Sequence, residues 1–227
     1  MSYIFPPPAI SAIPVHASAH WFPVHRIYCV GKNYAAHSRE MGSDPTKEIP
    51  CFFLKPADAI VTSGAMPYPP VTRNMHYEGE LVIAIGKGGA DIPVHDALDH
   101  VYGYAAGLDM TRRDLQTEAG KNGQPWDTGK GFDFSAPISA VYPVTEVGHI
   151  SKGRIQLWVN DHLRQDSDIS DLIWDCPKII SELSKLFTLQ PGDLVFTGTP
   201  AGVGAVVAGD VIKLSIEKLG SLVTRIC

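Results

Sequence analysis

The chain has 227 residues with 44% hydrophobic and 19% charged side chains, which is enough to bury a core without disulfide or metal support. A formal net charge of −5 and the lack of basic clusters exclude nucleic acid and an anionic membrane surface as expected partners. No apolar run approaches the roughly 20 residues of a membrane span, and the four separated cysteines fit reduced thiols, so we expect a cytoplasmic protein.

The first 25 residues are rich in proline and small side chains, and we expect an N-terminal arm or small cap there rather than core. Three consecutive prolines at residues 6–8 exclude regular helix in this part of the chain. The main domain is then predicted to comprise residues 26–227. It begins with a strand over residues 26–31 and a short helix over residues 33–41.

The middle of the chain alternates apolar, β-rich runs with polar segments. Strands are predicted over residues 51–55, 80–85 and 101–108, because each run is rich in β-formers and bounded by Gly, Pro or charged residues. Residues 109–118 then predict a helix. Residues 121–133 (KNGQPWDTGKGFD) form a glycine-rich loop with aromatic side chains, which is a common setting for functional residues.

The last third of the chain predicts three strands and one helix. Residues 154–160 alternate polar and apolar side chains, which is typical of a half-buried strand, and two more short strands follow at residues 194–198 and 211–216. Residues 177–187 place their apolar side chains at helical spacing. With 21 Gly and 18 Pro to make turns, we expect one β-rich α+β domain.

The segment His76-Tyr77-Glu78-Gly79-Glu80 suggests a metal site. If it belongs to a strand, Glu78 and Glu80 lie on one face, where two sheltered carboxylates need a proton or a cation between them. Asp109, at the end of another predicted strand, is a plausible third ligand. Three carboxylates without Cys or His favour Mg²⁺ or Mn²⁺ over Zn²⁺. The ordinary alternative is a solvated edge strand and a helix cap, and the spacing alone favours that alternative.

Two further features could carry chemistry. His37 and Glu40 are three residues apart in the predicted helix, where the carboxylate can fix the imidazole tautomer and leave the other ring nitrogen to accept a proton. A surface pair of little energetic value is the simpler interpretation of the spacing. Lys130, between two glycines, could approach a substrate anion. No phosphate-binding or dinucleotide-binding glycine motif is present.

Taken together and in order, the motifs resemble the fumarylacetoacetate hydrolase family. The resemblance extends from about residue 26 to the end of the sequence and rests on the stretches GKNYAAHSREMG, FFLKP, TRNMHYEGELVIAIG, YGYAAGLDMTRRDLQ, PWDTGKGFD, VNDHLRQDSDISDLIW and LVFTGTPAGVG. The N-terminal stretch is most similar to the bacterial fumarylpyruvate hydrolases of gentisate breakdown. Two positions depart from the family pattern, namely Lys32, often Arg, and Thr224, often Asn; we expect them to affect only local packing.

The resemblance implies a mixed β-sandwich roll, a homodimer and a bound Mg²⁺ or Mn²⁺. It assigns the metal ligands to Glu78, Glu80 and Asp109. It assigns a water-activating dyad, carried on a lid segment, to His37 and Glu40. The residues that it implies around the metal and the keto-acid end of the substrate are Lys130, Arg113, Gln116 and Thr199.

The implied activity is hydrolysis of a C–C bond in a 2,4-diketo acid, such as the cleavage of fumarylpyruvate into fumarate and pyruvate during aromatic breakdown. Arg112 is a candidate for binding the distal carboxylate of such a substrate. Alternatives within the family are an oxaloacetate decarboxylase and a 2-hydroxy-dienoate isomerase or tautomerase. A binding domain without catalysis is the remaining alternative, and the intact dyad and carboxylates oppose it.

Overall fold

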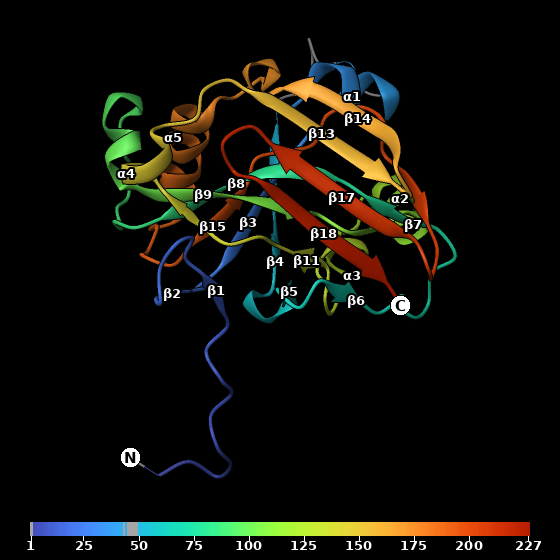
Figure 1. Cartoon of the computed structure of the whole chain (residues 1–227), viewed down its shortest axis with the longest axis horizontal. Helices are drawn as coiled ribbons and strands as arrows, with labels where there is room; N and C mark the ends of the chain where they lie inside the picture. The colour runs from blue at the N-terminus through green and yellow to red at the C-terminus, as the bar shows by residue number, and fades with distance from the viewer. Residues whose placement is uncertain (1, 43, 45–49) are drawn as a thin grey trace.

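Two β-sheets packed face to face form the body of the protein (Figure 1). The computed structural model describes residues 2–42, 44 and 50–227. The larger sheet has the order β12-β9-β8-β15-β3-β4, with bounds Tyr142–Pro143, Val101–Leu108, Gly79–Ile85, Leu194–Phe196, Ile27–Gly31 and Cys51–Lys55. The smaller sheet has the order β14-β13-β17-β18-β6, with bounds His162–Asp168, Arg154–Val159, Val211–Ile216, Ser221–Ile226 and Ala65–Met66.

Three small sheets complete the strands. A three-stranded sheet has the order β10-β7-β16, with bounds Thr111–Arg112, Met75–Tyr77 and Gly204–Val206. The pairs β1–β2 and β11–β5 have bounds Ala12–Pro14, Trp21–Pro23, Ala136–Pro137 and Ile60–Val61. Both large sheets contain parallel and antiparallel pairs, such as β15 with β3 and β8 with β9. The structure therefore confirms the expected mixed, β-rich α+β fold.

Helices are short and lie at the edges of the sheets. The α-helices α1 to α5 have bounds Ala35–Glu40, Arg113–Lys121, Asp127–Lys130, Val144–Val147 and Cys176–Leu186. Three 3₁₀ turns, η1 to η3, have bounds Ala57–Ala59, Val94–His100 and Ile169–Asp171. Among the described residues, no helix combines the length and apolar character that crossing a membrane requires.

Strand β8 is the centre of the fold because it is buried on both faces. Leu81 and Ile83 belong to the core between the two large sheets. Val82 and Ala84 face the other way, into a second core that also holds Ile13 of the N-terminal hairpin. This alternation follows from the two-residue period of a strand. A strand held from both sides is a rigid support for side chains at its ends.

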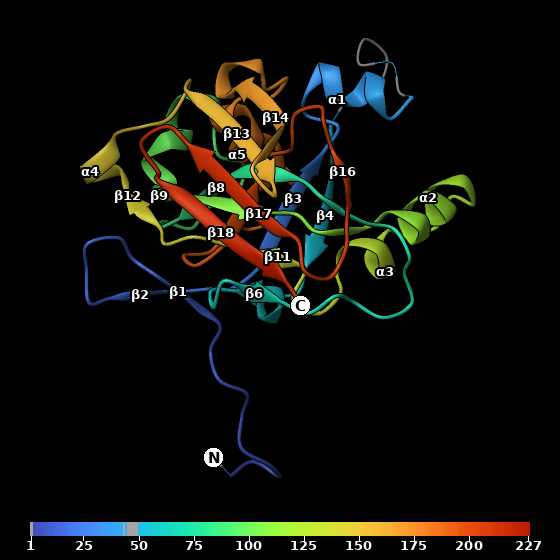
Figure 2. The same cartoon turned by 45° about the vertical axis from the view of Figure 1, so that its right-hand side comes forward.

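The N-terminal segment differs in part from the expected arm. Residues 2–10 project away from the body in both views (Figures 1 and 2). The β1–β2 hairpin, by contrast, buries Ile13 and Phe22 against the large sheet, so this half of the segment is core. Apolar side chains at alternate positions give each strand of the hairpin one buried face, which explains why the hairpin is core and residues 2–10 are not. The domain boundary at residue 26 remains a prediction.

Two further expectations need correction. The strand predicted to carry His76, Glu78 and Glu80 is interrupted at Glu78, because β7 pairs with β10 and β16 whereas β8 pairs with β9 and β15. The helix predicted from Asp109 begins only at Arg113. The amide of Asp109 donates to the carbonyl of Glu78 at 2.9 Å, which keeps this segment extended beside β7. The remaining predicted strands and the helix near residue 177 agree with the structure within a few residues.

Candidate metal centre and catalytic pocket

Three carboxylates from distant parts of the sequence meet at one end of the β8–β9 pair. Glu78 lies at the break between β7 and β8, Glu80 is the second residue of β8, and Asp109 follows β9 directly. The antiparallel register pairs Gly79 with Leu108, which places the start of β8 beside the end of β9. One oxygen from each carboxylate lies within 4.8 Å of the others. All three residues are at most 4% exposed, so the solvated edge-strand alternative does not hold.

Cationic side chains surround this cluster. The buried Nζ of Lys130 donates to Glu78 Oε2, Asp109 Oδ2 and Thr111 Oγ1, each at 2.7 Å. The guanidinium of Arg113 donates to Glu78 Oε1. Lys130 and Arg113 come from α3 and α2, which lie close to each other (Figure 2). Helix α3 contacts β4, and α2 contacts β7. Together with Lys55, whose Nζ lies 2.8 Å from Asp109 Oδ1, these side chains supply three positive charges beside the three carboxylates.

The pKa values of the two glutamates are driven apart by their surroundings. Burial alone would raise the pKa of Glu78, but the charges of Lys130 and Arg113 overcome that effect and hold it below its usual range. Burial also raises the pKa of Glu80, and the neighbouring carboxylates of Asp109 and Glu78 raise it further, well above its ordinary value. The amide of Gly198, at 2.7 Å from Glu80 Oε2, and the nearby charge of Lys130 lower this pKa in part. Among the described contacts, no ammonium or guanidinium is paired directly with Glu80.

These residues fit a divalent cation. All the donors are hard oxygens, which suits Mg²⁺ or Mn²⁺. Asp109 Oδ1 is buried and lies 2.8 Å from Lys55 Nζ, yet that ammonium donates to the carbonyls of Met110 and Lys130 and the oxygen accepts no hydrogen bond in the described structure. Asp109 Oδ1, which is ion-paired with Lys55 but accepts no aligned hydrogen bond from the described residues, and the buried Glu80 are together placed to bind a cation.

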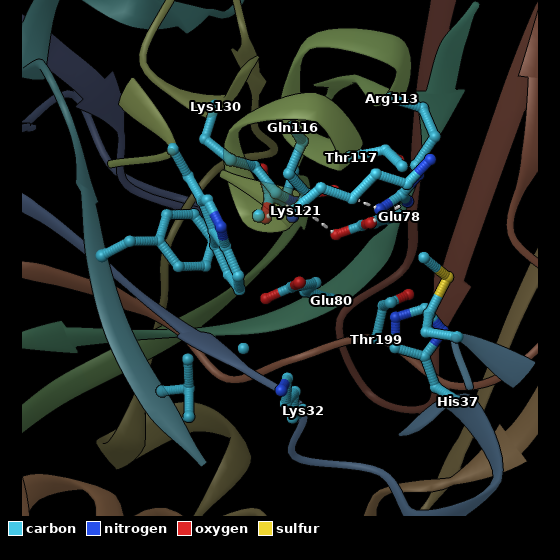
Figure 3. A pocket seen from close by; sticks show the side chains of 17 residues that line it. Lys32, His37, Glu78, Glu80, Arg113, Gln116, Thr117, Lys121, Lys130 and Thr199 are labelled. Atoms are coloured by element: carbon cyan, nitrogen blue, oxygen red, sulfur yellow. Dashed lines mark hydrogen bonds and ion pairs between the residues drawn. The ribbon is translucent and has the colours of Figure 1, made fainter. Parts of the chain in front are cut away.

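The predicted dyad lies on the other side of the same cavity. His37 Nδ1 is 3.0 Å from Glu40 Oε2, and Glu40 Oε1 accepts from the amide of Gly202 at 3.0 Å. The imidazole is buried, and it reaches the cavity opposite Lys130 (Figure 3). The interaction therefore belongs to a pocket and is not a surface pair. Part of the expected lid, residues 43 and 45–49, lies outside the described residues.

The structure also brings the three predicted substrate contacts to this cavity, whose volume is about 400 Å³. Gln116 Oε1 accepts from Arg113 at 2.5 Å, so these two side chains form one unit on α2. Thr199 Oγ1 donates to the carbonyl of Gly79 at 2.9 Å and accepts from Gln165 Nε2 at 2.8 Å. Thr199 is thus fixed against Gly79, which lies between Glu78 and Glu80 at the start of β8.

Sequence reasoning misplaced or missed several residues. Arg112 does not line the cavity, because its guanidinium stacks on Phe132 at 4.4 Å and donates to Thr128 O at 3.3 Å. Lys55, which holds the turn around Asp109, was not singled out, although it lies within the family-like FFLKP stretch. Lys32, expected to matter only for packing, lines the cavity.

Comparison with known proteins agrees with this geometry. Residues 26–227 match the family model "Fumarylacetoacetate (FAA) hydrolase C-terminal". A fumarylpyruvate hydrolase of Ralstonia sp. is 48% identical over 180 residues, which are 79% of this chain and 93% of the relative. A mitochondrial oxaloacetate tautomerase of Homo sapiens is 43% identical over 210 residues, or 92% and 95% of the two chains.

Solved structures match as well. The crystal structure of fumarylpyruvate hydrolase from Pseudomonas aeruginosa in complex with Mn²⁺ and pyruvate superposes with a TM-score of 0.97. That protein is 53% identical in sequence, and the match covers 99% of each chain.

Proposed function

The chain belongs to the fumarylacetoacetate hydrolase family, and from that membership we propose that it is a metal-dependent hydrolase cleaving the C–C bond of a 2,4-diketo acid. The proposed substrate is fumarylpyruvate, with fumarate and pyruvate as products. One observation carries the proposal: the buried carboxylates of Glu78, Glu80 and Asp109 share a cavity with the His37–Glu40 pair. The hydrolase relative and the neighbour solved with Mn²⁺ and pyruvate support the substrate class.

Glu78, Glu80 and Asp109 would hold the cation, Mg²⁺ or Mn²⁺. When bound, it supplies positive charge that polarises a carbonyl and stabilises a developing enolate. Arg113 and Gln116, joined on α2, are placed to bind the carboxylate at the keto-acid end of the substrate. These contacts would fix the proximal end of the substrate and leave its acyl group toward the dyad.

The His37–Glu40 pair would activate water. With Nδ1–H held by Glu40, the Nε2 atom of His37 accepts a proton from water, and the hydroxide oxygen bonds to the distal carbonyl carbon. The bond between that carbon and the neighbouring CH₂ then breaks. The acyl group leaves as a carboxylate, and the CH₂ carbon takes up a proton to give pyruvate. Glu40, held by Gly202, keeps the imidazole in the required orientation.

Lys130 contributes charge where the enolate forms. Burial lowers the pKa of its ammonium, but Asp109 and Glu78 more than offset this and raise it above its ordinary value. The side chain is therefore protonated at neutral pH and acts as a fixed positive charge, not as a base. Such a charge in a water-poor cavity stabilises the anionic transition state.

Oxaloacetate chemistry is the second candidate, because the human relative at 43% identity is an oxaloacetate tautomerase. Tautomerisation and decarboxylation need no attacking water. Turnover in H₂¹⁸O separates the reactions: hydrolysis of fumarylpyruvate places one ¹⁸O in the new carboxylate of fumarate. Fumarate without label would rule out the proposed hydrolytic step, and interconversion of oxaloacetate tautomers without cleavage of fumarylpyruvate would favour the second candidate.

Three further properties belong to this proposal. We propose that the chain forms a homodimer, acts in the cytoplasm and serves the breakdown of aromatic compounds. The family membership and the fumarylpyruvate hydrolase relatives support these proposals. Sedimentation of the purified protein at micromolar concentration tests the first directly, because a dimer has twice the mass of the 24.6 kDa chain.

A further inference from the structure

Besides Lys130, two lysines line the cavity: Lys32 and Lys121. Lys32 follows β3 and precedes the dyad residue His37 on the same β3–α1 connection. Lys121 ends α2, on the wall that carries Arg113 and Gln116. The two lysines therefore carry the same charge on different walls of one pocket.

The backbone of Lys32 is in the left-handed region, with φ of 63°. Non-glycine residues are uncommon there, and Gly or Asn would make the same turn at lower cost. Lys32 also borders the cavity. A strained backbone at such a position indicates that the long cationic side chain has a functional role there. The neighbouring Asn33 holds the turn in place through hydrogen bonds to Trp174 O at 2.9 Å and Thr197 O at 2.8 Å.

A substrate bound with its keto-acid end at the carboxylate cluster has its acyl group toward Lys32. Arg113 and Lys130 are bonded to the carboxylate cluster on one side of the cavity, where the keto-acid end belongs. Lys32 lies on the opposite side in the view of Figure 3, below Glu80 and beside the segment that carries His37. An acyl group whose carbonyl faces His37 would extend from the metal ligands toward this lysine.

We propose that Lys32 is a specificity residue whose ammonium binds the distal carboxylate of the acyl group, so that the enzyme prefers dicarboxylic acylpyruvates over neutral ones. This inference rests on the proposed hydrolase function. Lys32 is half-buried, so a charge-assisted contact there is less screened than on the open surface. Arg112, the earlier candidate for this contact, faces Phe132 outside the cavity.

The test compares two substrates that differ at the distal end. Wild-type, Lys32→Met and Lys32→Arg proteins are assayed with fumarylpyruvate, which has the second carboxylate, and with acetylpyruvate, which lacks it. In Lys32→Met we expect kcat/KM for fumarylpyruvate to fall roughly 10- to 100-fold, mainly through KM, with acetylpyruvate within about threefold of wild type. Lys32→Arg keeps the charge and should retain the preference.

Lys121→Met is the matched control, because it removes the same charge from another wall of the cavity. It should change kcat/KM for the two substrates by the same factor. Should Lys32→Met fail to fold, Lys32→Asn removes the charge with a residue that adopts the left-handed conformation readily. Metal affinity and Tm of each variant report whether the pocket is intact.

An equal loss on both substrates in the Lys32 variants, or no loss on fumarylpyruvate, would overturn the assignment of Lys32 and leave the hydrolase function standing. If the wild-type protein cleaves neither diketo acid, the proposed function fails and this inference fails with it. A change of preference in Lys121→Met instead of Lys32→Met would move the distal subsite to the α2 wall.

Discussion

At the scale of single residues, Glu80 combines a stability cost with its proposed role in metal binding. Its carboxyl is buried beside Asp109 and Glu78, and its pKa in the folded protein is raised well above the value of about 4.3 expected for an unfolded chain. A raised pKa means that the metal-free fold loses stability as pH rises from that unfolded value through the folded one. Without a metal the ionised form of Glu80 is therefore unfavourable in the fold, and a bound cation would neutralise its charge.

Glu80→Gln tests this trade-off. The amide oxygen of Gln can still accept from Gly198, so we expect a higher Tm for the EDTA-treated variant than for EDTA-treated wild type at pH 8, and a smaller difference near pH 5. One kcal/mol corresponds to roughly 2–4 °C in a domain of this size. The stabilisation that Mn²⁺ gives the wild-type protein should disappear. Glu118→Gln, on the exposed face of α2, is the control. A lower Tm for metal-free Glu80→Gln would contradict the predicted charge repulsion.

His37→Ala tests the dyad. Loss of the base should lower kcat for fumarylpyruvate roughly 100- to 10,000-fold. The affinity for Mn²⁺ in titration calorimetry should change little, because His37 lies across the cavity from Lys130 and its carboxylate partners (Figure 3). His95→Ala, at an exposed 3₁₀ position, should leave both quantities unchanged. Near-normal kcat in His37→Ala would remove His37 from the reaction.

At the scale of elements, the pocket depends on how the β3–α1 connection is attached to the body. Asn33 is fully buried, donates to Trp174 O and Thr197 O, and accepts from Trp174 N at 2.7 Å. Thr197 directly precedes Gly198, whose amide supports Glu80. One side chain thus links the segment that carries the dyad with the loop that supports a metal ligand.

Asn33→Ala should therefore affect both stability and activity. Removing the partner of three backbone groups, of which that of Thr197 is buried and those of Trp174 are partly buried, should lower the free energy of unfolding by about 2–4 kcal/mol. Urea denaturation measures this loss, and the midpoint should shift without a change in slope. Asn122→Ala, at the exposed end of α2, should have little effect. A loss below about 0.5 kcal/mol would show that the connection is held by other contacts.

Local patterns in the sequence identified most elements but not their pairing. Strands β4 and β9 were predicted with their observed bounds. Each is a continuous apolar run with polar ends, and this pattern indicates where a strand begins and ends. The break at Glu78 has no local signal, since it arises from pairing of β7 and β8 with different partners. The helix expected from Asp109 begins late for the same reason. Tertiary pairing overrides local preference at these two places, and both adjoin the carboxylates of the candidate metal site.

For the site, the sequence pattern alone left Glu78, Glu80 and Asp109 undecided, and the family resemblance selected them. The structure explains why they meet: the register of β8 and β9 brings positions about 30 residues apart side by side. Lys55 was not singled out, and Lys32 was expected to affect only local packing, because an isolated lysine is usually solvated. Only their burial and their place beside Asp109 or the cavity distinguish them.

At the scale of the whole molecule, the N-terminal segment divides into two parts with different roles. Residues 2–10 extend away from the body and expose Ile4 (95%) and Ile10 (78%). The hairpin that follows buries Ile13 and Phe22 in the second core, behind β8. The hairpin therefore supports the strand that carries Glu80, whereas the arm does not.

Two truncations test this division. Deletion of residues 2–10 should leave the Tm of the diluted protein nearly unchanged, within about 0.5 kcal/mol of stability. Deletion of residues 2–24 removes the buried side chains of the hairpin, each worth roughly 1.5–3 kcal/mol, and should destabilise the fold severely. Equal stability of the two truncated proteins would show that the hairpin is dispensable and that the core begins at the predicted domain boundary.

The central claim is metal-dependent cleavage of an acylpyruvate, and steady-state turnover of a substrate panel tests it most directly. Fumarylpyruvate, acetylpyruvate, fumarylacetoacetate and oxaloacetate are each assayed with Mg²⁺, with Mn²⁺ and with EDTA. We predict that fumarylpyruvate is cleaved with the highest kcat/KM, that EDTA abolishes the reaction and that added metal restores it. Turnover of oxaloacetate alone, or cleavage of fumarylpyruvate that EDTA does not inhibit, would contradict the claim.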